Sequence, residues 1–256
     1  MDTLLEINIS KYNELFNNLK INIKKNTISA ISGPNNCGKT TLIKIIDRLI
    51  KTENEIIIND KYIEEYSNEE YSSLVQSVIP EYISFHENTL KEELLYIDSE
   101  EEKIYYLIKL FKIGKILNKN IKNLNTKELV LFQIIKAISK SNNLVIIDNI
   151  DEYFTNEELN KLYKNFYSCI DKYNMTFVIT CINLDSVVLL DELFIIDKGK
   201  TKIYGRPLEV LEKDNVLNKI GLELPFMIDL SVKLRDYDLI KEIELSKEKL
   251  IEILWN

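Results

Sequence analysis

The chain has 256 residues, of which 45% are apolar and 29% are charged, proportions that are ordinary for a globular protein and argue against disorder. Its net charge of −8 disfavours nucleic acid as a partner, because a basic face supplies most of that affinity. Three scattered cysteines and a single histidine, His86, exclude a disulfide framework and a zinc site of the usual spacing, and they fit a reducing compartment.

The first elements in chain order are β-strands. Residues 4–10 and 19–23 alternate apolar and polar side chains, which predicts strands with one buried face. A third strand, 27–32, runs directly into a loop with two glycines. A helix is expected over 41–50, where apolar residues recur at helical spacing, and another strand over 55–60.

The second half of the chain alternates helices and strands. Apolar residues recur at helical spacing from about 88 to 140. Two apolar runs follow, 144–148 and 176–180, separated by a predicted helix, and such runs are typical of parallel strands covered on both faces. Residues 192–205 predict a hairpin, and the segment from about 214 is helical again. This order indicates an α/β core with a helical insertion.

The loop after the third strand carries a phosphate-binding motif. It fits the pattern GxxxxGK[ST] with these residues: Gly33, Pro34, Asn35, Asn36, Cys37, Gly38, Lys39 and Thr40. The predicted nucleotide site also includes Thr41. The glycines let backbone amides surround phosphates at a helix start, where Lys39 is expected to reach the β- and γ-phosphates of ATP and Thr40 to ligate Mg²⁺. The alternative, an accidental match in a turn, is disfavoured by the strand and the helix on either side.

A second motif lies about a hundred residues further along the chain. Residues 144–148 read LVIID, four apolar residues followed by a carboxylate at the end of a predicted strand. In a parallel sheet this position lies beside the phosphate loop, where Asp148 can hold Mg²⁺. A strand that ends in a solvated Asp is the alternative, and the upstream loop favours the metal-binding interpretation.

These motifs resemble those of ABC ATPases, and in detail the A component of energy-coupling factor (ECF) importers, which take up vitamins and metal ions. Gln76 resembles the Q-loop glutamine that links the γ-phosphate and Mg²⁺ to the transmembrane partner. Residues 89–96 and 197–211 are similar to the start of the family's helical subdomain and to its last strands. Tyr12 resembles the aromatic residue that stacks on adenine, although an ordinary tyrosine at the end of a strand is the alternative.

The resemblance extends to the end of the chain. Residues 221–236 and 243–254 resemble the C-terminal extension that helps to pair two A subunits, with a generic amphipathic helix pair as the alternative. The implied fold is an α/β P-loop NTPase of the ABC type, with a β-rich N-terminal part. The nucleotide-binding domain is expected over 1–213, with a helical subdomain at about 77–140, and the helical extension over 214–256.

Three positions depart from the family pattern. Asn149 stands where ABC ATPases carry a catalytic glutamate, and an amide cannot accept a proton at neutral pH. Residues 124–128 read LNTKE in place of the LSGGQ element, which closes over the ATP of the partner subunit. Cys181 stands in place of the switch histidine. We therefore expect binding of ATP and Mg²⁺ with impaired hydrolysis. Slow turnover by a variant site is the alternative.

The resemblance implies an importer subunit that works with several partners. These are a second ABC ATPase in a homo- or heterodimer, a transmembrane T-type subunit and a substrate-binding S-type subunit. No apolar run approaches the ~20 residues of a membrane helix, so we expect a cytoplasmic protein held on the inner face of the membrane by its partners. A nucleotide-binding regulatory or assembly subunit is one alternative. A DNA-repair or ribosomal ABC protein is another, which the acidic charge disfavours.

Overall fold

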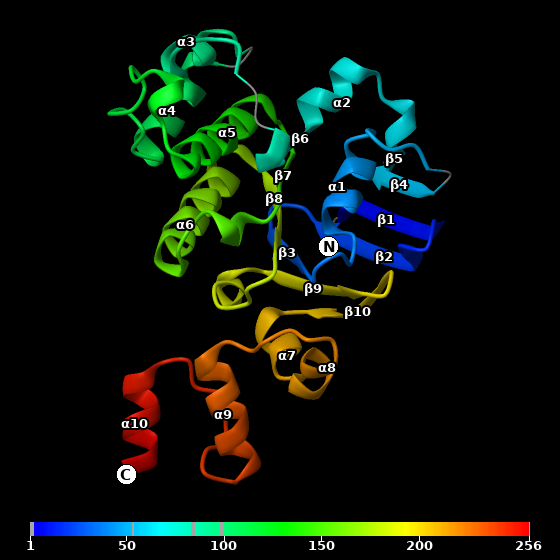
Figure 1. Cartoon of the computed structure of the whole chain (residues 1–256), viewed down its shortest axis with the longest axis vertical. Helices are drawn as coiled ribbons and strands as arrows, with labels where there is room; N and C mark the ends of the chain where they lie inside the picture. The colour runs from blue at the N-terminus through cyan, green and yellow to red at the C-terminus, as the bar shows by residue number, and fades with distance from the viewer. Residues whose placement is uncertain (1–2, 53, 83–84, 98–99, 256) are drawn as a thin grey trace.

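Two β-sheets form the frame of the protein in the computed structural model, which describes residues 3–52, 54–82, 85–97 and 100–255 (Figure 1). The smaller sheet is antiparallel, with the strand order β2-β1-β4-β5. Its strands are β1 (Thr3–Tyr12), β2 (Phe16–Lys24), β4 (Glu55–Ile58) and β5 (Lys61–Tyr62). The sequence alternation over 4–10 and 19–23 is thus confirmed, because both segments pair with one face buried.

The larger sheet has the strand order β10-β9-β3-β8-β7-β6. Its strands are β3 (Ile28–Ser32), β6 (Val75–Val78), β7 (Leu144–Ile147), β8 (Thr176–Cys181), β9 (Glu192–Asp197) and β10 (Lys200–Gly205). All are parallel to their neighbours except β10, which forms the predicted hairpin with β9. The carboxyl ends of β3, β6, β7 and β8 therefore meet at one edge, as the apolar runs predicted.

Helices lie on both faces of the larger sheet and beyond its β10 edge. They are α1 (Lys39–Ile46), α2 (Asn68–Leu74), α3 (Leu90–Leu95), α4 (Glu101–Leu110), α5 (Thr126–Lys140), α6 (Asn156–Tyr173), α7 (Pro207–Leu211), α8 (Asp214–Lys219), α9 (Phe226–Asp236) and α10 (Lys247–Trp255). Capping boxes start α2, α3, α5 and α6. In these boxes the cap side chain and the glutamate three residues later satisfy each other's backbone amides.

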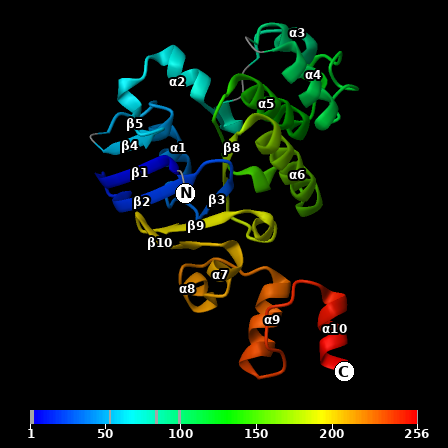
Figure 2. The ribbon, with the colours of Figure 1, turned by 180° about the vertical axis from the view of Figure 1, so that it is seen from behind.

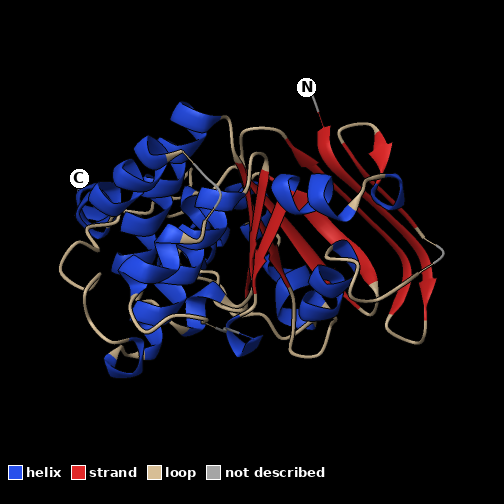
Figure 3. Ribbon diagram, turned by 90° about the horizontal axis from the view of Figure 1, so that it is seen from above, coloured by secondary structure: helices blue, strands red, loops and turns tan. Residues whose placement is uncertain are grey.

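Two hydrophobic cores lie on opposite faces of the larger sheet. Along β7, Leu144 and Ile146 pack with α1 and the smaller sheet, whereas Val145 and Ile147 pack with α5 and α6. This alternation follows from the two-residue period of a strand. Seen from above, most helices gather on one side of this sheet and the smaller sheet lies on the other (Figure 3). Helix α1 is thereby fixed between the two sheets.

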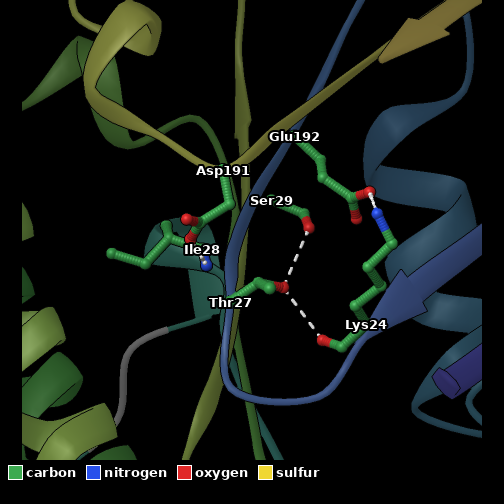
Figure 4. Close-up of polar contacts among 6 residues, drawn as sticks. All are labelled: Lys24, Thr27, Ile28, Ser29, Asp191 and Glu192. Carbon is green, nitrogen blue, oxygen red and sulfur yellow. Dashed lines mark hydrogen bonds and ion pairs between the residues drawn. The ribbon is translucent and has the colours of Figure 1, made fainter. Parts of the chain in front are cut away.

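Polar contacts fix the amino-terminal end of β3 (Figure 4). The Thr27 hydroxyl donates to the Lys24 carbonyl oxygen over 2.9 Å, which closes the turn from β2. The Ile28 amide donates to a carboxylate oxygen of Asp191 over 2.8 Å, and Lys24 forms an ion pair with Glu192. Because both acidic residues lie at the start of β9, these contacts set the register of β3 and hence the position of the loop that follows it.

The C-terminal helices project from the β10 edge of the larger sheet, as the two opposite views show (Figures 1 and 2). Leu217, Leu222, Ile228 and Val232 nevertheless belong to the same buried cluster as α5 and α6. The segment from 214 onwards is helical, as predicted. No helix in the described ranges is long and apolar enough to cross a membrane.

Two sequence predictions differ from the structure. The helix after the loop ends at Ile46 rather than near 50, because Arg48 adopts a left-handed backbone conformation (φ 58°) that breaks the helical path. The segment around Gln76 is a strand, β6, which the short sequence VQSV did not reveal. This second difference changes the candidate site.

Candidate functional site

The loop between β3 and α1 requires glycine at two positions. A methyl group at Gly33 would lie 2.1 Å from the carbonyl oxygen of Ile196, so no larger residue fits. Gly38 has φ 103°, and a methyl group there would lie 2.7 Å from the Phe16 ring. Helix α1 then begins without an acidic side chain in its first turn. Its free amides and positive dipole end are therefore left for an anion.

Lys39 lies inside the loop with only 6% of its surface exposed. Its ammonium donates to the carbonyl oxygens of Gly33, over 2.8 Å, and Pro34, over 3.3 Å. A buried ammonium needs such acceptors, because an unpaired charge in the interior is costly. Phosphate oxygens at the same place would be stronger, charged acceptors.

A hydroxyl–carboxylate network joins the loop to the ends of β7 and β8. The Thr40 hydroxyl donates to one oxygen of Asp148 over 2.6 Å, and the Thr180 hydroxyl donates to the other. The same Thr180 oxygen accepts a hydrogen bond from the backbone amide of Asn149 over 2.8 Å. Sequence analysis did not identify Thr180, although its place at the end of an apolar strand next to β7 was a usable signal.

An open cleft of about 460 Å³ lies above the loop. Residues 35–41 line it together with four side chains from elsewhere: Leu15, Glu81, Asn149 and Ile182. The structure therefore brings Asn149 to the predicted phosphate site. Sequence analysis did not identify Leu15 or Glu81, because nothing in their local sequence marks them. Glu81 lies in the 3₁₀ turn η2 (Pro80–Tyr82), directly after β6.

The donor set fits a magnesium nucleotide rather than a metal held by protein alone. Thr40 and Asp148 place two oxygens 2.6 Å apart at the edge of the cleft. Mg²⁺ prefers oxygen ligands and usually takes one or two carboxylates, with substrate phosphates and water completing its shell. Within the described ranges, no group of three His, Cys, Asp or Glu residues could hold a metal. Cation binding here thus calls for phosphate oxygens.

The structure does not bring Gln76 to this cleft. Gln76 lies within β6, opposite Val145 of β7, and its side-chain amide donates to the Ser72 carbonyl oxygen. It lines a separate polar pocket with Asp47, Arg48 and Tyr71. The prediction placed Gln76 in a loop, whereas a residue inside the strand lies short of the edge where phosphates would bind. Glu81 is the residue from this segment that faces the cleft.

Cys181 and Tyr12 lie beside the site but do not line the cleft. Cys181 is 1% exposed, and burial raises the pKa of its thiol to about 12, so the group is neutral. Its chain neighbour Ile182 lines the cleft instead. Tyr12 ends β1 and packs on the Phe16 ring, with ring centres 6.3 Å apart. Phe16 in turn contacts the loop near Gly38.

The residues in the place of the LSGGQ element form a helix cap. Asn125 and Glu128 satisfy each other's backbone amides at the start of α5, over 2.8 and 3.0 Å. The Glu128 carboxylate also accepts from Lys119 over 3.1 Å, and these contacts lower its pKa. Lys127 pairs with Glu158 of α6 over 2.6 Å. The segment is thus ordered by internal contacts and does not line the cleft of its own chain.

Negative charge gathers next to the cleft in the 3₁₀ turn η4 (Ile150–Glu152). Burial raises the pKa of Glu152, and the nearby charges of Asp151, Asp148 and Glu81 raise it further. One Asp151 oxygen accepts the amides of Ile182 and Asn183 over 2.8 and 2.7 Å, which joins this turn to the end of β8. These carboxylates would repel an anion unless a cation or the loop amides offset them.

Comparisons with known proteins agree with this geometry. The ABC transporter family model matches residues 16–151. The carnitine transport ATP-binding protein OpuCA of Listeria monocytogenes is 26% identical over 210 residues, which are 76% of this chain and 52% of that protein. This chain thus spans about half the length of that relative.

Two further similarities cover most of the chain. The energy-coupling factor transporter ATP-binding protein EcfA1 of Streptococcus agalactiae is 22% identical over 253 residues, which are 93% of this chain and 89% of that protein. The solved structure of cbiO1 from Clostridium perfringens, part of the ABC transporter complex cbiONQ, is 19% identical with a TM-score of 0.71. That likeness covers 92% of this chain and 100% of the other, and it shows a shared fold.

Proposed function

The chain belongs to the ABC transporter family, and on this premise we propose that it is the ATP-binding subunit of an importer of the energy-coupling factor type. The observation that carries the proposal is the cleft lined by Lys39 and Thr40, with Asp148 hydrogen-bonded to Thr40 at its edge, above a loop that accepts only glycine at two positions. The similarity to EcfA1 over nearly the whole chain supports the importer type.

The loop binds a nucleotide by exchanging its internal contacts. Lys39 leaves the carbonyl oxygens of Gly33 and Pro34 and donates to phosphate oxygens, while the amides at the start of α1 surround the β-phosphate. Thr40 and Asp148 are the residues that would hold Mg²⁺, and the bound ion would neutralise charge on the phosphates. Tyr12, at the end of β1, is proposed to stack on adenine.

Hydrolysis by this chain is proposed to be slow. Asn149 lines the cleft, but its amide cannot accept a proton from water. Cys181 is neutral and buried, so it cannot replace a histidine as a donor to the γ-phosphate. General-base catalysis is typically worth about 10²–10⁴ in rate, so a chain without a carboxylate at position 149 is expected to turn over slowly.

The proposed partners follow from the same family assignment. A second ABC ATPase would receive residues 124–128 of this chain over its own nucleotide, and the extension over 214–256 would help to pair the two subunits. The T-type and S-type subunits would anchor the pair to the inner face of the cell membrane. Exposed apolar side chains of the helical subdomain, including Leu95 and Tyr96, offer a surface for the T-type subunit.

Titration calorimetry with MgATP tests nucleotide binding directly. Wild-type chain should bind, and Lys39→Ala should bind at least tenfold more weakly, because charge-assisted hydrogen bonds are worth about 1.5–3 kcal/mol each. Lys51→Ala is the matched control, since Lys51 is exposed just beyond α1 and should bind as wild type does. Equal affinity of the Lys39→Ala and wild-type chains would contradict the assignment of the loop.

A regulatory or assembly subunit is the second candidate, favoured by the side-chain amide of Asn149 in the cleft. The two candidates differ in their need for a membrane protein. Co-purification of a T-type membrane subunit, with transport lost in the Lys39→Ala variant, supports the importer. A nucleotide-dependent dimer that never captures a membrane subunit supports the regulatory role.

A further inference from the structure

The cleft contains very few groups that could take a proton from water. Asn35, Asn36 and Asn149 contribute amides, which are not bases at neutral pH. Lys39 is an ammonium, and burial raises the pKa of the Cys37 thiol, so that group stays protonated. Among the described side chains that line the cleft, Glu81 is the carboxylate.

Asp148 lies beside the cleft but is already engaged. One of its oxygens accepts the Thr40 hydroxyl over 2.6 Å, and the other accepts the Thr180 hydroxyl. Its side chain is 2% exposed. Glu81, in contrast, is exposed and forms no hydrogen bond or ion pair within the described ranges, so its carboxylate is available.

The backbone around Glu81 is anchored on both sides. The Asp148 amide donates to the Val78 carbonyl oxygen over 2.9 Å, which ties the end of β6 to the end of β7. The Tyr82 hydroxyl accepts Lys44 of α1 over 3.0 Å, and the Lys44 ammonium lies 5.0 Å from the centre of the Tyr82 ring. Glu81 thus lies between an anchored strand and a residue held by the same helix that starts with Lys39.

The register of the sheet places Glu81 at the same edge as Asn149. Val78 is paired with Ile147, so β6 and β7 end together and both following turns meet at the cleft. We propose, on the premise of the proposed function, that Glu81 is the proton acceptor for the water that attacks the γ-phosphorus of ATP. The slow turnover of this chain would then depend on a carboxylate from the β6 turn, with the Asn149 amide facing the same water.

The proposed step is hydrolysis of the terminal phosphate of ATP. The water oxygen forms a bond to the γ-phosphorus, and the bond from that phosphorus to the bridging oxygen breaks. The electron pair of the broken bond leaves with ADP, and one water proton passes to a Glu81 oxygen. The products are ADP and inorganic phosphate, and the proton on Glu81 is then released to solvent. No oxidant, reductant or further co-reactant is needed.

The test compares Glu81→Gln with the wild-type protein and with a matched control variant, each as the purified full chain. Glu81→Gln keeps the shape and removes the acceptor, and it should lower kcat for ATP at least about 100-fold. MgATP affinity measured by calorimetry should stay equal or become a few-fold tighter, because a like charge is removed. Glu69→Gln is the matched control, because Glu69 is an exposed residue of α2 that does not line the cleft, and it should keep kcat within about threefold.

A rescue variant keeps the test decisive. Glu81→Gln combined with Asn149→Glu places a carboxylate on the other side of the cleft and should recover at least tenfold of the lost rate. Unchanged kcat in Glu81→Gln, or an equal loss in Glu69→Gln, overturns the inference. Wild-type chain that binds MgATP but hydrolyses no faster than Lys39→Ala also overturns it, while leaving the proposed function intact. Absence of MgATP binding by the wild-type chain overturns both.

Discussion

At the scale of single residues, Thr180 and Asn149 determine the shape of the cleft edge. Asn149 adopts the left-handed conformation (φ 45°, ψ 47°), which asparagine tolerates better than most residues. Its backbone amide donates to the Thr180 hydroxyl, which itself donates to Asp148. A single hydroxyl thus supports both the strained backbone at 149 and the orientation of the carboxylate that would face Mg²⁺.

Thr180→Val should destabilise the fold and weaken nucleotide binding together. Valine has nearly the same shape but leaves the Asn149 amide and one Asp148 oxygen without a partner, at about 1–3 kcal/mol for each buried group. We expect the free energy of unfolding in urea to fall by about 2–6 kcal/mol for the two groups together, and the Kd for MgATP to rise. Thr180→Ser keeps the hydroxyl and is the control. An equal loss in Thr180→Ser would assign the effect to the methyl group.

At the scale of secondary structure, α1 connects the cleft to a second, buried polar site. The helix starts with Lys39 and Thr40 and is followed by Asp47, whose carboxylate accepts the Ser77 hydroxyl of β6 over 2.6 Å. Burial raises the pKa of Asp47 from 3.8 to about 6. The Arg48 guanidinium, which could have offset this charge, lies 3.9 Å from the centre of the Tyr71 ring.

Because the pKa of Asp47 is raised, Asp47→Asn is predicted to increase the free energy of unfolding by an amount that depends on pH. A folded-state pKa of about 6 against 3.8 means that the charged carboxylate destabilises the fold above pH 6, and that protonation relieves this cost as the pH falls toward 4. Asp47→Asn can still accept the hydrogen bond from Ser77. It should therefore raise the free energy of unfolding by as much as about 3 kcal/mol at pH 8 and by much less at pH 4.5.

Urea unfolding of the wild-type and Asp47→Asn proteins at both of these pH values measures the difference in the free energy of unfolding. Asp47→Ala is the control, because it removes the charge and the acceptor together and should gain less. A gain that is the same at both pH values would show that desolvation of the carboxylate is not its cause.

At the scale of the whole molecule, the chain has two ends with different surfaces. The cleft lies at the carboxyl edge of the larger sheet, whereas α9 and α10 extend from the β10 side (Figure 1). Helix α10 leaves Ile251 and Ile253 about half exposed and Trp255 85% exposed. Apolar side chains gathered in this way usually mark an interaction surface.

This surface predicts that α10 contributes to self-association. Ile251→Ser combined with Trp255→Ser should raise the dimer dissociation constant at least tenfold, measured by sedimentation velocity with MgATP. The Kd for MgATP should stay within twofold, because α10 does not line the cleft. Tyr105→Ser removes an exposed aromatic ring from α4 and serves as the control. If the double variant associates as strongly as the wild type, α10 is not part of the pairing surface.

The sequence by itself determined the elements whose signals are local. The phosphate loop over 33–40 is set by residue spacing next to a strand and a helix, and the runs 144–148 and 176–180 specify buried parallel strands by composition alone. What only the tertiary structure decided is which residues from separate strands meet above that loop. Gln76 was expected there and Glu81 was not, because the pairing of Val78 with Ile147 fixes where β6 ends. Register between strands about seventy residues apart is a long-range property, so no local pattern contains it.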